Sequence, residues 1–187
     1  ILEKFEDNPF LPKFYKDSQK NAFPLELFFL AERYHQIKEN NQDLFGSCIL
    51  SDYFFIKSKF FANNNLKDDE LQLFNRLFDI MVSSLPKPDF VIYLYASVSR
   101  LKENIKKRGR VFEQAIKDEY LQNIQSRYLD FFRKQRDFPV LVLDVSYVDF
   151  LLDEQSYLNI KKELYIHRQN GFYHKVLSPN DAEVDQA

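Results

Sequence analysis

The sequence has no tryptophan, and it has little cysteine, little glycine and little net charge. Cys48 is its one cysteine, so these residues cannot form an internal disulfide bond, and a reducing cytoplasm is the expected setting. The 26 Lys and Arg residues nearly balance the 28 Asp and Glu residues, which leaves a net charge of −2 at pH 7. Domains that bind the phosphate backbone of nucleic acids are usually strongly basic, so we do not expect a nucleic-acid partner.

Long apolar runs are missing as well. No uninterrupted apolar stretch approaches the roughly 20 residues that a bilayer crossing needs, and the first residues show no signal-peptide pattern, so we expect no membrane partner. Aromatic rings, in contrast, are plentiful, because 17% of the 187 residues are aromatic and 20 residues are Phe. A disordered chain carries far fewer rings. We therefore expect one packed domain over residues 1–175, followed by a solvated tail over residues 176–187.

Glycine occurs only at Gly46, Gly109 and Gly171. Neither the dinucleotide-binding pattern G-x-G-x-x-G nor the phosphate-binding loop G-x-x-x-x-G-K-[ST] occurs in these residues. The nucleophile pattern G-x-S-x-G is absent too. The three histidines lack metal-ligand spacing, and with a single cysteine they give no zinc signature, so no protein-bound metal is expected.

Three short apolar runs, residues 47–52, 89–95 and 139–145, predict buried strands. Each is nearly continuous in apolar residues, which is typical of a parallel sheet covered on both faces. The opening residues, "ILEKFED", look like a further strand in progress. We therefore suspect that an earlier strand and helix precede Ile1.

Between these runs, apolar residues recur close to the helical period of 3.6 over residues 25–37, 68–85 and 117–132. A short helix is also expected over "SRLKENIKK". Strands that alternate with helices, without a linker or repeat, predict an α/β fold. The expected architecture is a three-layer domain in which helices cover a parallel sheet.

Carboxylates follow two of the expected strands. Glu3, Glu6 and Asp7 come after the opening run, and Asp52 ends the run 47–52. Ligands of parallel sheets bind beyond the carboxyl ends of the strands, so one of these acids could take a proton from a bound hydroxyl. Acidic residues at strand ends are also common as plain solvated junctions, and the pattern leaves both interpretations open.

Four cations surround Gly109 in the segment "NIKKRGRVFEQAI", residues 104–116. Cations at the end of a helix suit the negative end of its dipole, which is a purely structural explanation. The alternative is a phosphate clamp, in which Gly109 lets the backbone turn and the Arg108 and Arg110 guanidinium groups bind phosphate oxygens. A nucleic-acid contact is the third possibility, but no aromatic residues are interleaved with these cations.

The order and spacing of five segments resemble a known family. They are "ILEKFEDNPFLPKFYKD", "AFPLELFFLAERYHQ", "SDYFFIKSKFFA", "LPKPDFVIYLYASVSRLKENIKKRGRVFEQ" and "PVLVLDVSYVDF". Together they look like the bacterial deoxyadenosine/deoxyguanosine kinases of the deoxynucleoside kinase family, over residues 1 to about 170. The resemblance implies a P-loop kinase-like α/β fold and a homodimer. It also implies transfer of the γ-phosphate of ATP, with Mg²⁺, to the 5′-hydroxyl of a deoxynucleoside, with a purine preferred.

On the acceptor side, the resemblance implies roles for five residues. Glu3 matches the glutamate that acts as base toward the 5′-hydroxyl, and Tyr15 matches the tyrosine that binds the sugar 3′-hydroxyl. Glu26 stands where the family commonly has a glutamine that pairs with the nucleobase edge. Glutamate cannot donate unless it is protonated, so the base is left open. Asp52, in "SDYFF", stands near an acid-arginine-serine motif as a second acid or base, and Lys57 lies near a base-contacting position.

On the phosphate side, "KKRGRVFEQ" resembles the lid of these kinases. Arg108 and Arg110 would close over the transferring phosphoryl group, where fixed guanidinium groups stabilise the developing charge. Glu113 would hold the 3′-hydroxyl. Asp149 and Phe150, in "YVDF", would line the adenine side of ATP, although an ordinary loop explains them equally well.

The chain departs from the family in lacking the glycine-rich phosphate loop. We read the domain as one without its N-terminal strand, P-loop and first helix, and we expect that residues 1–187 alone cannot phosphorylate. Two other functions stay open. A nucleoside-monophosphate kinase would need further arginines at the acceptor site. In a non-catalytic binding module, the apolar stripe Leu71, Phe74 and Phe78 would bind a partner if it is exposed; if it is buried, it is part of the core.

Overall fold

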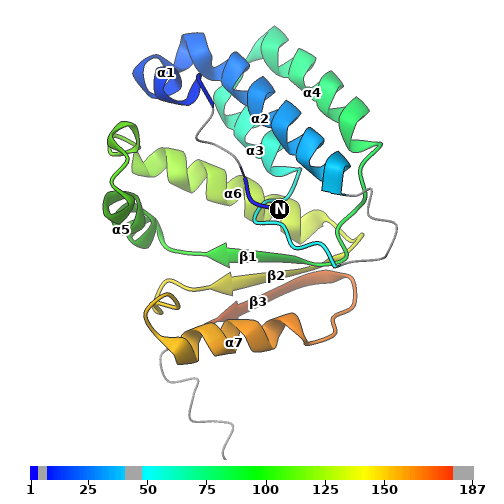
Figure 1. Ribbon diagram of the computed structural model, residues 1–187, viewed down its shortest axis with the longest axis vertical. Coiled ribbons are helices and arrows are strands. Elements are labelled where there is room, and N and C mark those ends of the chain that lie inside the picture. The colour runs from blue at the N-terminus through cyan, green and yellow to red at the C-terminus, as the bar shows by residue number, and fades with distance from the viewer. Residues whose placement is uncertain (4–7, 41–47, 179–187) are drawn as a thin grey trace, which may run out of the picture. The chain divides into compact units, whose positions relative to one another are not determined.

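The computed structural model describes residues 1–3, 8–40 and 48–178 of the chain (Figure 1). The chain forms two compact units. Unit 1 comprises Ile1–Lys87 and Arg110–Tyr128, and unit 2 comprises Pro88–Gly109 and Leu129–Ala187.

Unit 1 is helical. Its long helix α2 packs against α1, α3 and α4, and α3 also packs against α4 (Figure 1). The core between these helices is rich in rings, and the Phe55 and Phe78 rings stack with centroids 5.2 Å apart. The elements are α1 (Leu11–Lys16), α2 (Ser18–Asn40), α3 (Lys57–Asn65), α4 (Asp68–Val82), the 3-10 helix η1 (Val111–Glu113) and the first part of α6 (Asp118–Lys134).

Helix α2 begins at Ser18, well before the predicted start at residue 25. Asp17 caps it, because Asp17 Oδ1 accepts the Lys20 N–H at 3.2 Å and satisfies a donor of the first turn. Pro24 lies inside the helix. It has no N–H and so removes one helical hydrogen bond, but the helix continues on both sides of it.

Unit 2 contains a three-stranded parallel sheet in the order β1-β2-β3. Its middle strand is buried from Val140 to Leu143, because helices cover both faces. On one face, Leu141 and Leu143 pack with Ile160 of α7 and Leu101 of α5. On the other face, the Tyr93 ring lies 5.5 Å from the Phe132 ring of α6. The elements are β1 (Val91–Tyr95), α5 (Val98–Arg108), the end of α6, β2 (Pro139–Asp144), α7 (Glu154–Leu164) and β3 (Gly171–Val176).

The predicted α/β fold with a covered parallel sheet is confirmed, and two of its predicted strands correspond to β1 and β2. The predicted strand over residues 47–52 is wrong for residues 48–52, and residues 1–3 form no strand either; residues 4–7 and 47 lie outside the described ranges. The Ile1 nitrogen donates to the Leu50 carbonyl, and the Asp52 N–H donates to the Ile1 carbonyl at 3.0 Å. This is a single rung of parallel pairing, which is too little to build a strand.

Strand β3 was not predicted, because its six residues include Gly171, His174 and Lys175 and four of them are exposed. It continues to Val176, and Leu177 behind it is buried, so ordered structure runs past residue 175. Residues 179–187 of the predicted tail lie outside the described residues.

Among the helices that the structure describes, none combines the length and the apolar character needed to cross a membrane.

Candidate active site

Backbone contacts with residues 50–52 position Glu3. Besides the rung between Ile1 and that segment, the Glu3 N–H donates to Asp52 Oδ1 at 2.8 Å. Asp52 was predicted as a second acid or base, and its side chain holds the backbone of Glu3. The arrangement turns the Glu3 side chain toward α2 and α3.

Two cations bind the Glu3 carboxylate. Arg33 of α2 contacts Oε1 through Nε at 2.7 Å and Nη2 at 2.6 Å, and Lys57 of α3 contacts Oε2 through Nζ at 2.7 Å. The Arg33 side chain is only 4% exposed and also donates to Ser58 Oγ at 2.8 Å. Its guanidinium carbon lies 4.8 Å from the centre of the Phe29 ring, so it is packed from the side as well.

Burial and neighbouring charges together shift the pKa values of this cluster. Burial disfavours the ionised Glu3 carboxylate, but Arg33 and Lys57 outweigh burial and hold its pKa below the ordinary value. Burial and the neighbouring Arg33 lower the pKa of Lys57, against the attraction of Glu3. Burial raises the pKa of Tyr53, whose hydroxyl donates to Gln36 Oε1 at 3.0 Å, to about 12. Glu3 is therefore an anion at neutral pH.

Glu26 lies on α2 and is buried, with 2% of its surface exposed. Its Oε1 accepts a hydrogen bond from Asn65 Nδ2 at 2.7 Å. Burial raises its pKa to about 7, although the hydrogen bond from Asn65 and the charges of Arg33 and Lys57 act to lower it. Two carboxylates of unit 1 thus differ in ionisation, because Glu3 has two direct cationic partners and Glu26 has none among the described residues.

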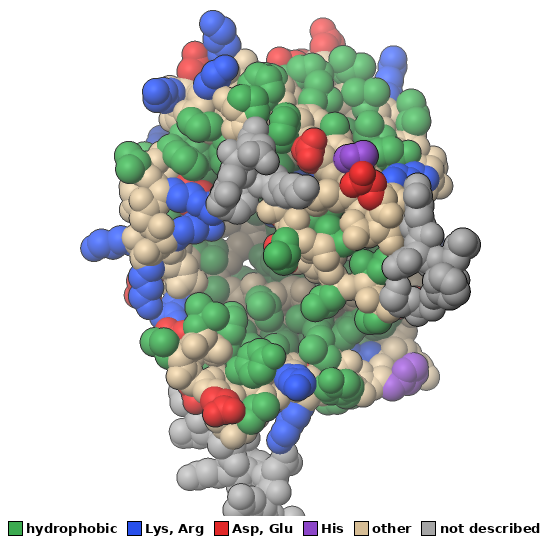
Figure 2. Space-filling view, in the orientation of Figure 1, with side chains coloured by type: hydrophobic (Ala, Val, Ile, Leu, Met, Phe, Trp, Pro, Cys, Tyr) green, Lys and Arg blue, Asp and Glu red, His purple; other side chains and the backbone are tan. Residues whose placement is uncertain are grey.

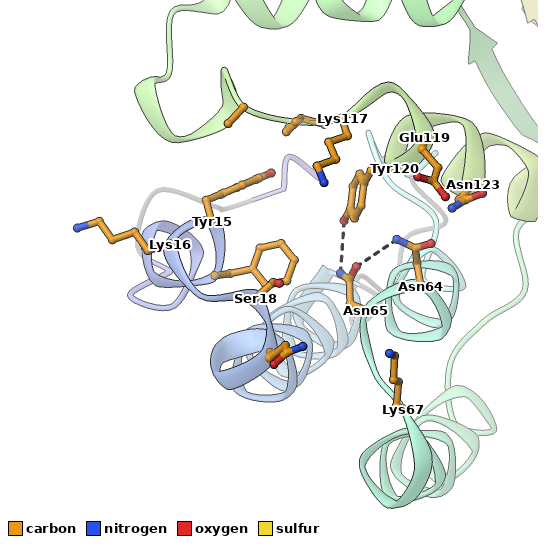
Figure 3. Close-up of a pocket in the computed structure, with 14 residues that line it drawn as sticks. Tyr15, Lys16, Ser18, Asn64, Asn65, Lys67, Lys117, Glu119, Tyr120 and Asn123 are labelled. Atoms are coloured by element: carbon orange, nitrogen blue, oxygen red, sulfur yellow. Dashed lines mark hydrogen bonds between the residues drawn. The ribbon is translucent and has the colours of Figure 1, made fainter.

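A cavity of ≈ 570 Å³ opens beside this network, within unit 1. Tyr15 of α1, Asn65 of α3 and Tyr120 of α6 line it (Figure 3). Figure 3 shows Tyr120 reaching from α6 toward Asn65, whose Nδ2 lies 3.4 Å from the Tyr120 hydroxyl. The cavity therefore connects Tyr15, predicted to bind the sugar, with the residue that holds Glu26.

The predicted lid follows α5. Ser97 caps the start of α5, because its hydroxyl accepts the Arg100 N–H at 3.3 Å, and Gly109, which has a φ of 74°, follows the last residue of the helix. Figure 2 shows Lys and Arg side chains gathered over α5, whose last turn carries Lys106, Lys107 and Arg108. The chain passes from unit 2 to unit 1 between Gly109 and Arg110.

Beyond the glycine, Arg110 Nη1 donates to Glu113 Oε1 at 3.0 Å. The Glu113 side chain is 7% exposed and lies in η1, which packs against α1. The Phe112 ring lies 5.5 Å from the Tyr15 ring. Tyr15 and Glu113, both predicted for the sugar 3′-hydroxyl, therefore stand on neighbouring elements.

Asp149 and Phe150 follow the carboxyl end of β2 in unit 2. Asp149 Oδ2 contacts Arg100 Nη2 at 3.1 Å and Lys107 Nζ at 3.9 Å. Desolvation acts to raise the pKa of Asp149, but the hydrogen bond from Arg100 and the nearby positive charge lower it. Phe150 packs against the core on that face of the sheet. This loop occupies the position where parallel sheets bind ligands.

The structure thus brings Glu3, Lys57 and Asp52 into one cluster, and it joins Arg110 to Glu113. Sequence reasoning missed Arg33, which links Glu3 to α2, and Asn65, which binds Glu26. The spacing in the sequence could have indicated Arg33, because it lies seven residues, or two helical turns, after Glu26 and therefore on the same face of α2.

The family model for deoxynucleoside kinases matches residues 1–167. The chain therefore belongs to the deoxynucleoside kinase family, and the predicted resemblance is confirmed. Membership makes it a kinase of deoxynucleosides, with the fold of P-loop kinases.

Individual relatives agree with this assignment. The chain is 34% identical to the deoxyguanosine kinase of Bacillus subtilis (strain 168) over 175 residues, which cover 89% of this chain and 84% of that protein. It is 29% identical to the deoxyadenosine kinase of Lactobacillus acidophilus, covering 88% of this chain and 81% of that one. Its structure resembles deoxyadenosine kinase from M. mycoides with bound dATP, with a TM-score of 0.71, 27% identity and coverage of 89% and 86%.

Proposed function

We propose that this protein transfers the γ-phosphate of ATP to the 5′-hydroxyl of a purine deoxynucleoside, with Glu3 as the group that receives the hydroxyl proton. The assignment of Glu3 rests on one observation: Arg33 and Lys57 each bind one oxygen of its carboxylate. The names of the relatives, which act on deoxyguanosine or deoxyadenosine, support a purine acceptor.

In the reaction, the 5′-oxygen attacks the γ-phosphorus in line, and the bond from that phosphorus to the β,γ-bridging oxygen breaks. ADP leaves with the electron pair of that bond, and the hydroxyl proton passes to the Glu3 carboxylate. A low pKa makes Glu3 a weak base, but phosphoryl transfer has a loose transition state that needs little activation of the nucleophile. Its main contribution is to orient the hydroxyl, and Asp52 assists by holding the backbone of Glu3.

The remaining acceptor-side residues have complementary tasks. Tyr15 and Glu113, on neighbouring elements, bind the sugar 3′-hydroxyl, and Glu26 and Lys57 face the nucleobase. Arg108 and Arg110 bracket Gly109 and place positive charge on the transferring phosphoryl group. The ion pair of Arg110 with Glu113 would couple phosphate binding to sugar binding.

Asp149 and Phe150 line the adenine side of ATP, at the carboxyl end of β2.

Mg²⁺ is bound in such kinases largely by substrate phosphates. Within the ranges that the structure describes, no three His, Cys, Asp or Glu side chains come together to hold a metal. Mg²⁺ would enter the site bound to the phosphates of ATP. Dimerisation, which the family resemblance implies, is checked by the molar mass in solution.

The test uses the full-length gene product with ATP and Mg²⁺, offers the four natural deoxynucleosides separately and follows monophosphate formation by chromatography. We expect a purine deoxynucleoside to be converted, and Glu3→Gln to lower kcat by roughly 100-fold or more with an unchanged circular dichroism spectrum. Glu39→Gln is the matched control, because Glu39 is an exposed carboxylate of α2 that pairs with His35. A folded protein that binds ATP but converts no deoxynucleoside would refute the proposal.

A further inference from the structure

Asn65 holds the Glu26 side chain in one orientation. It is the last residue of α3, it lines the cavity of unit 1, and its Nδ2 donates to Glu26 Oε1 at 2.7 Å. In the described part of the chain, this is the one hydrogen bond that the Glu26 carboxylate accepts. The other carboxylate oxygen and the second lone pair of Oε1 accept no hydrogen bond from the described residues.

The surrounding hydrogen bonds prevent a flip of the Asn65 amide that would exchange its Oδ1 and Nδ2. Its Nδ2 donates to Glu26 and also lies 3.4 Å from the Tyr120 hydroxyl, while its Oδ1 accepts from Asn64 Nδ2 at 3.3 Å (Figure 3). A flipped amide would bring its oxygen against a carboxylate oxygen, and both are acceptors. The network thus presents Glu26 as an acceptor.

The two purines differ at the edge that such an acceptor would meet. Guanine has two adjacent donors, N1–H and the N2 amino group, whereas adenine has one donor, the N6 amino group, beside the acceptor N1. A carboxylate with two acceptor oxygens pairs with both donors of guanine, but with adenine one of its oxygens faces the N1 lone pair. A buried mismatch of this kind is costly, because neither group has another partner.

We propose that Glu26, held as a double acceptor by Asn65, selects guanine over adenine, so that deoxyguanosine is the preferred substrate and Asn65 is a positioning residue for specificity. The inference rests on the proposed function, in which Glu26 faces the nucleobase. Arg33 and Lys57 add to the preference, because their positive charge favours both the Glu26 anion and an O6 acceptor near it. A bidentate pair of this kind discriminates between bases by roughly tenfold to a hundredfold.

The selection depends on the proton of Glu26. When Glu26 is protonated, its O–H donates to adenine N1 while its other oxygen accepts from N6, so the advantage of guanine is lost. Burial raises the pKa of Glu26 to about 7, and the charged or titratable groups that act on it or on which it acts are Glu3, Arg33, Lys57 and Tyr120. Glu3 stays ionised and Tyr120 stays neutral near pH 7, because the pKa of Glu3 is lowered and that of Tyr120 is raised.

The experiment measures kcat/KM of the full-length gene product for deoxyguanosine and for deoxyadenosine between pH 6 and 8.5. Their ratio is the readout, because effects common to both substrates cancel in it. We expect the ratio to favour deoxyguanosine at pH 8 and to fall by about tenfold toward pH 6. The ratio for Glu26→Gln should fall by about tenfold or more at pH 8 and should lose its pH dependence, because an amide both donates and accepts.

Two further variants isolate Asn65. Asn65→Leu removes the hydrogen-bond donor that favours the Glu26 anion, so Glu26 should lose its proton at a higher pH. The ratio of kcat/KM for deoxyguanosine to that for deoxyadenosine should therefore reach the wild-type value only at higher pH. Asn63→Leu makes the same substitution two residues earlier in α3, at a residue that does not line the cavity, and should leave the ratio unchanged. A role of Asn65 in folding alone would lower both values of kcat/KM equally. If Asn65→Leu does not fold, the wild-type pH series and Glu26→Gln still decide the question.

Failure of the inference differs from failure of the proposed function. A wild-type enzyme that prefers deoxyadenosine at pH 8, or a ratio that neither substitution changes, would overturn the inference while the kinase activity stands. If neither purine deoxynucleoside is phosphorylated, the proposed function fails and the inference fails with it.

Discussion

Glu3 and Glu26 carry the same carboxyl group in the same unit, but their surroundings push their pKa values apart. Burial raises the pKa of both, and the direct ion pairs of Glu3 with Arg33 and Lys57 overcome it for Glu3 only. Divergent pKa values within one site are a common sign of divided roles. Here they separate a carboxylate that stays ionised, Glu3, from a carboxyl group that titrates near neutral pH, Glu26.

The raised pKa of Glu26 makes stability depend on pH. Glu26 has a pKa of about 7 in the folded protein, against an ordinary value of 4.5. Between these values the unfolded chain has released the proton and the folded protein has kept it, so the free energy of unfolding falls as pH rises. We expect Glu26→Gln to gain stability relative to wild type from pH 4.5 to pH 8, by about 1 to 3 kcal/mol.

Urea unfolding at pH 4.5 and pH 8 measures this change. The exposed Glu39→Gln serves again as the control, because it should show little change in the difference between the two pH values. A stability difference between Glu26→Gln and wild type that is the same at both pH values would contradict the assigned ionisation.

At the level of single residues, the sequence alone allowed us to predict candidates but not their partners. Glu3 and Lys57 were both predicted for the site, yet their ion pair joins residues 54 positions apart and depends on how α3 packs against α2. Asn65 gave no signal, because an asparagine near the end of a helix is more often a cap or surface residue. Its role became visible only when the structure brought it to Glu26.

Among the elements, α5 has a sharply defined end. Gly109 adopts a φ of 74° and donates its N–H to the Ile105 carbonyl at 3.3 Å, and nothing lies within 4 Å of where a Cβ would stand. Gly109→Ala should therefore lower stability by about 1 kcal/mol through backbone strain alone, which thermal unfolding measures as a lower Tm. Gly109→Asn should lose less, because asparagine tolerates this conformation better. An alanine variant as stable as wild type would argue against the left-handed cap.

Elements were predictable where the pattern was strong. The largely buried β2 and the periodic α4, which has three acidic residues in its first turn, were expected close to their observed bounds. The strand expected over residues 47–52 failed, because an apolar run forms a strand only where neighbouring strands complete its hydrogen bonds. Strand β3, which was not predicted, shows that a segment without a strong apolar pattern can form a strand when a neighbour completes its hydrogen bonds. Its residues are mixed in type and mostly exposed, but they pair with β2.

Across the whole molecule, the boundary between the two units falls inside helix α6, between Tyr128 and Leu129. Unfolding either unit would remove the packing of part of this helix. We therefore expect one cooperative transition, followed in parallel by far-ultraviolet circular dichroism and tyrosine fluorescence. Phe74→Ala in the core of unit 1 and Leu143→Ala in the core of unit 2 should each shift that single transition, by roughly 2 to 5 kcal/mol. Two separate transitions would show that the units unfold independently.

The α/β fold class was predictable from the order of strands and helices, because that order follows from local patterns along the chain. The division into two units was not, since it depends on which distant segments pack together. Arg110–Tyr128 belongs with the helices of unit 1 even though the sequence places it between two parts of unit 2.

The hydrogen bond from Asn65 to Glu26 also has an evolutionary consequence. Codons for glutamate and glutamine differ only in their first nucleotide, and the Asn65 amide can donate to the side-chain oxygen of either residue. If Glu26 selects the purine as proposed, a gene of this kind is one point mutation away from a protein that accepts the other purine, and Asn65 need not change with it. Duplicated copies could divide the two salvage substrates between them by that substitution alone.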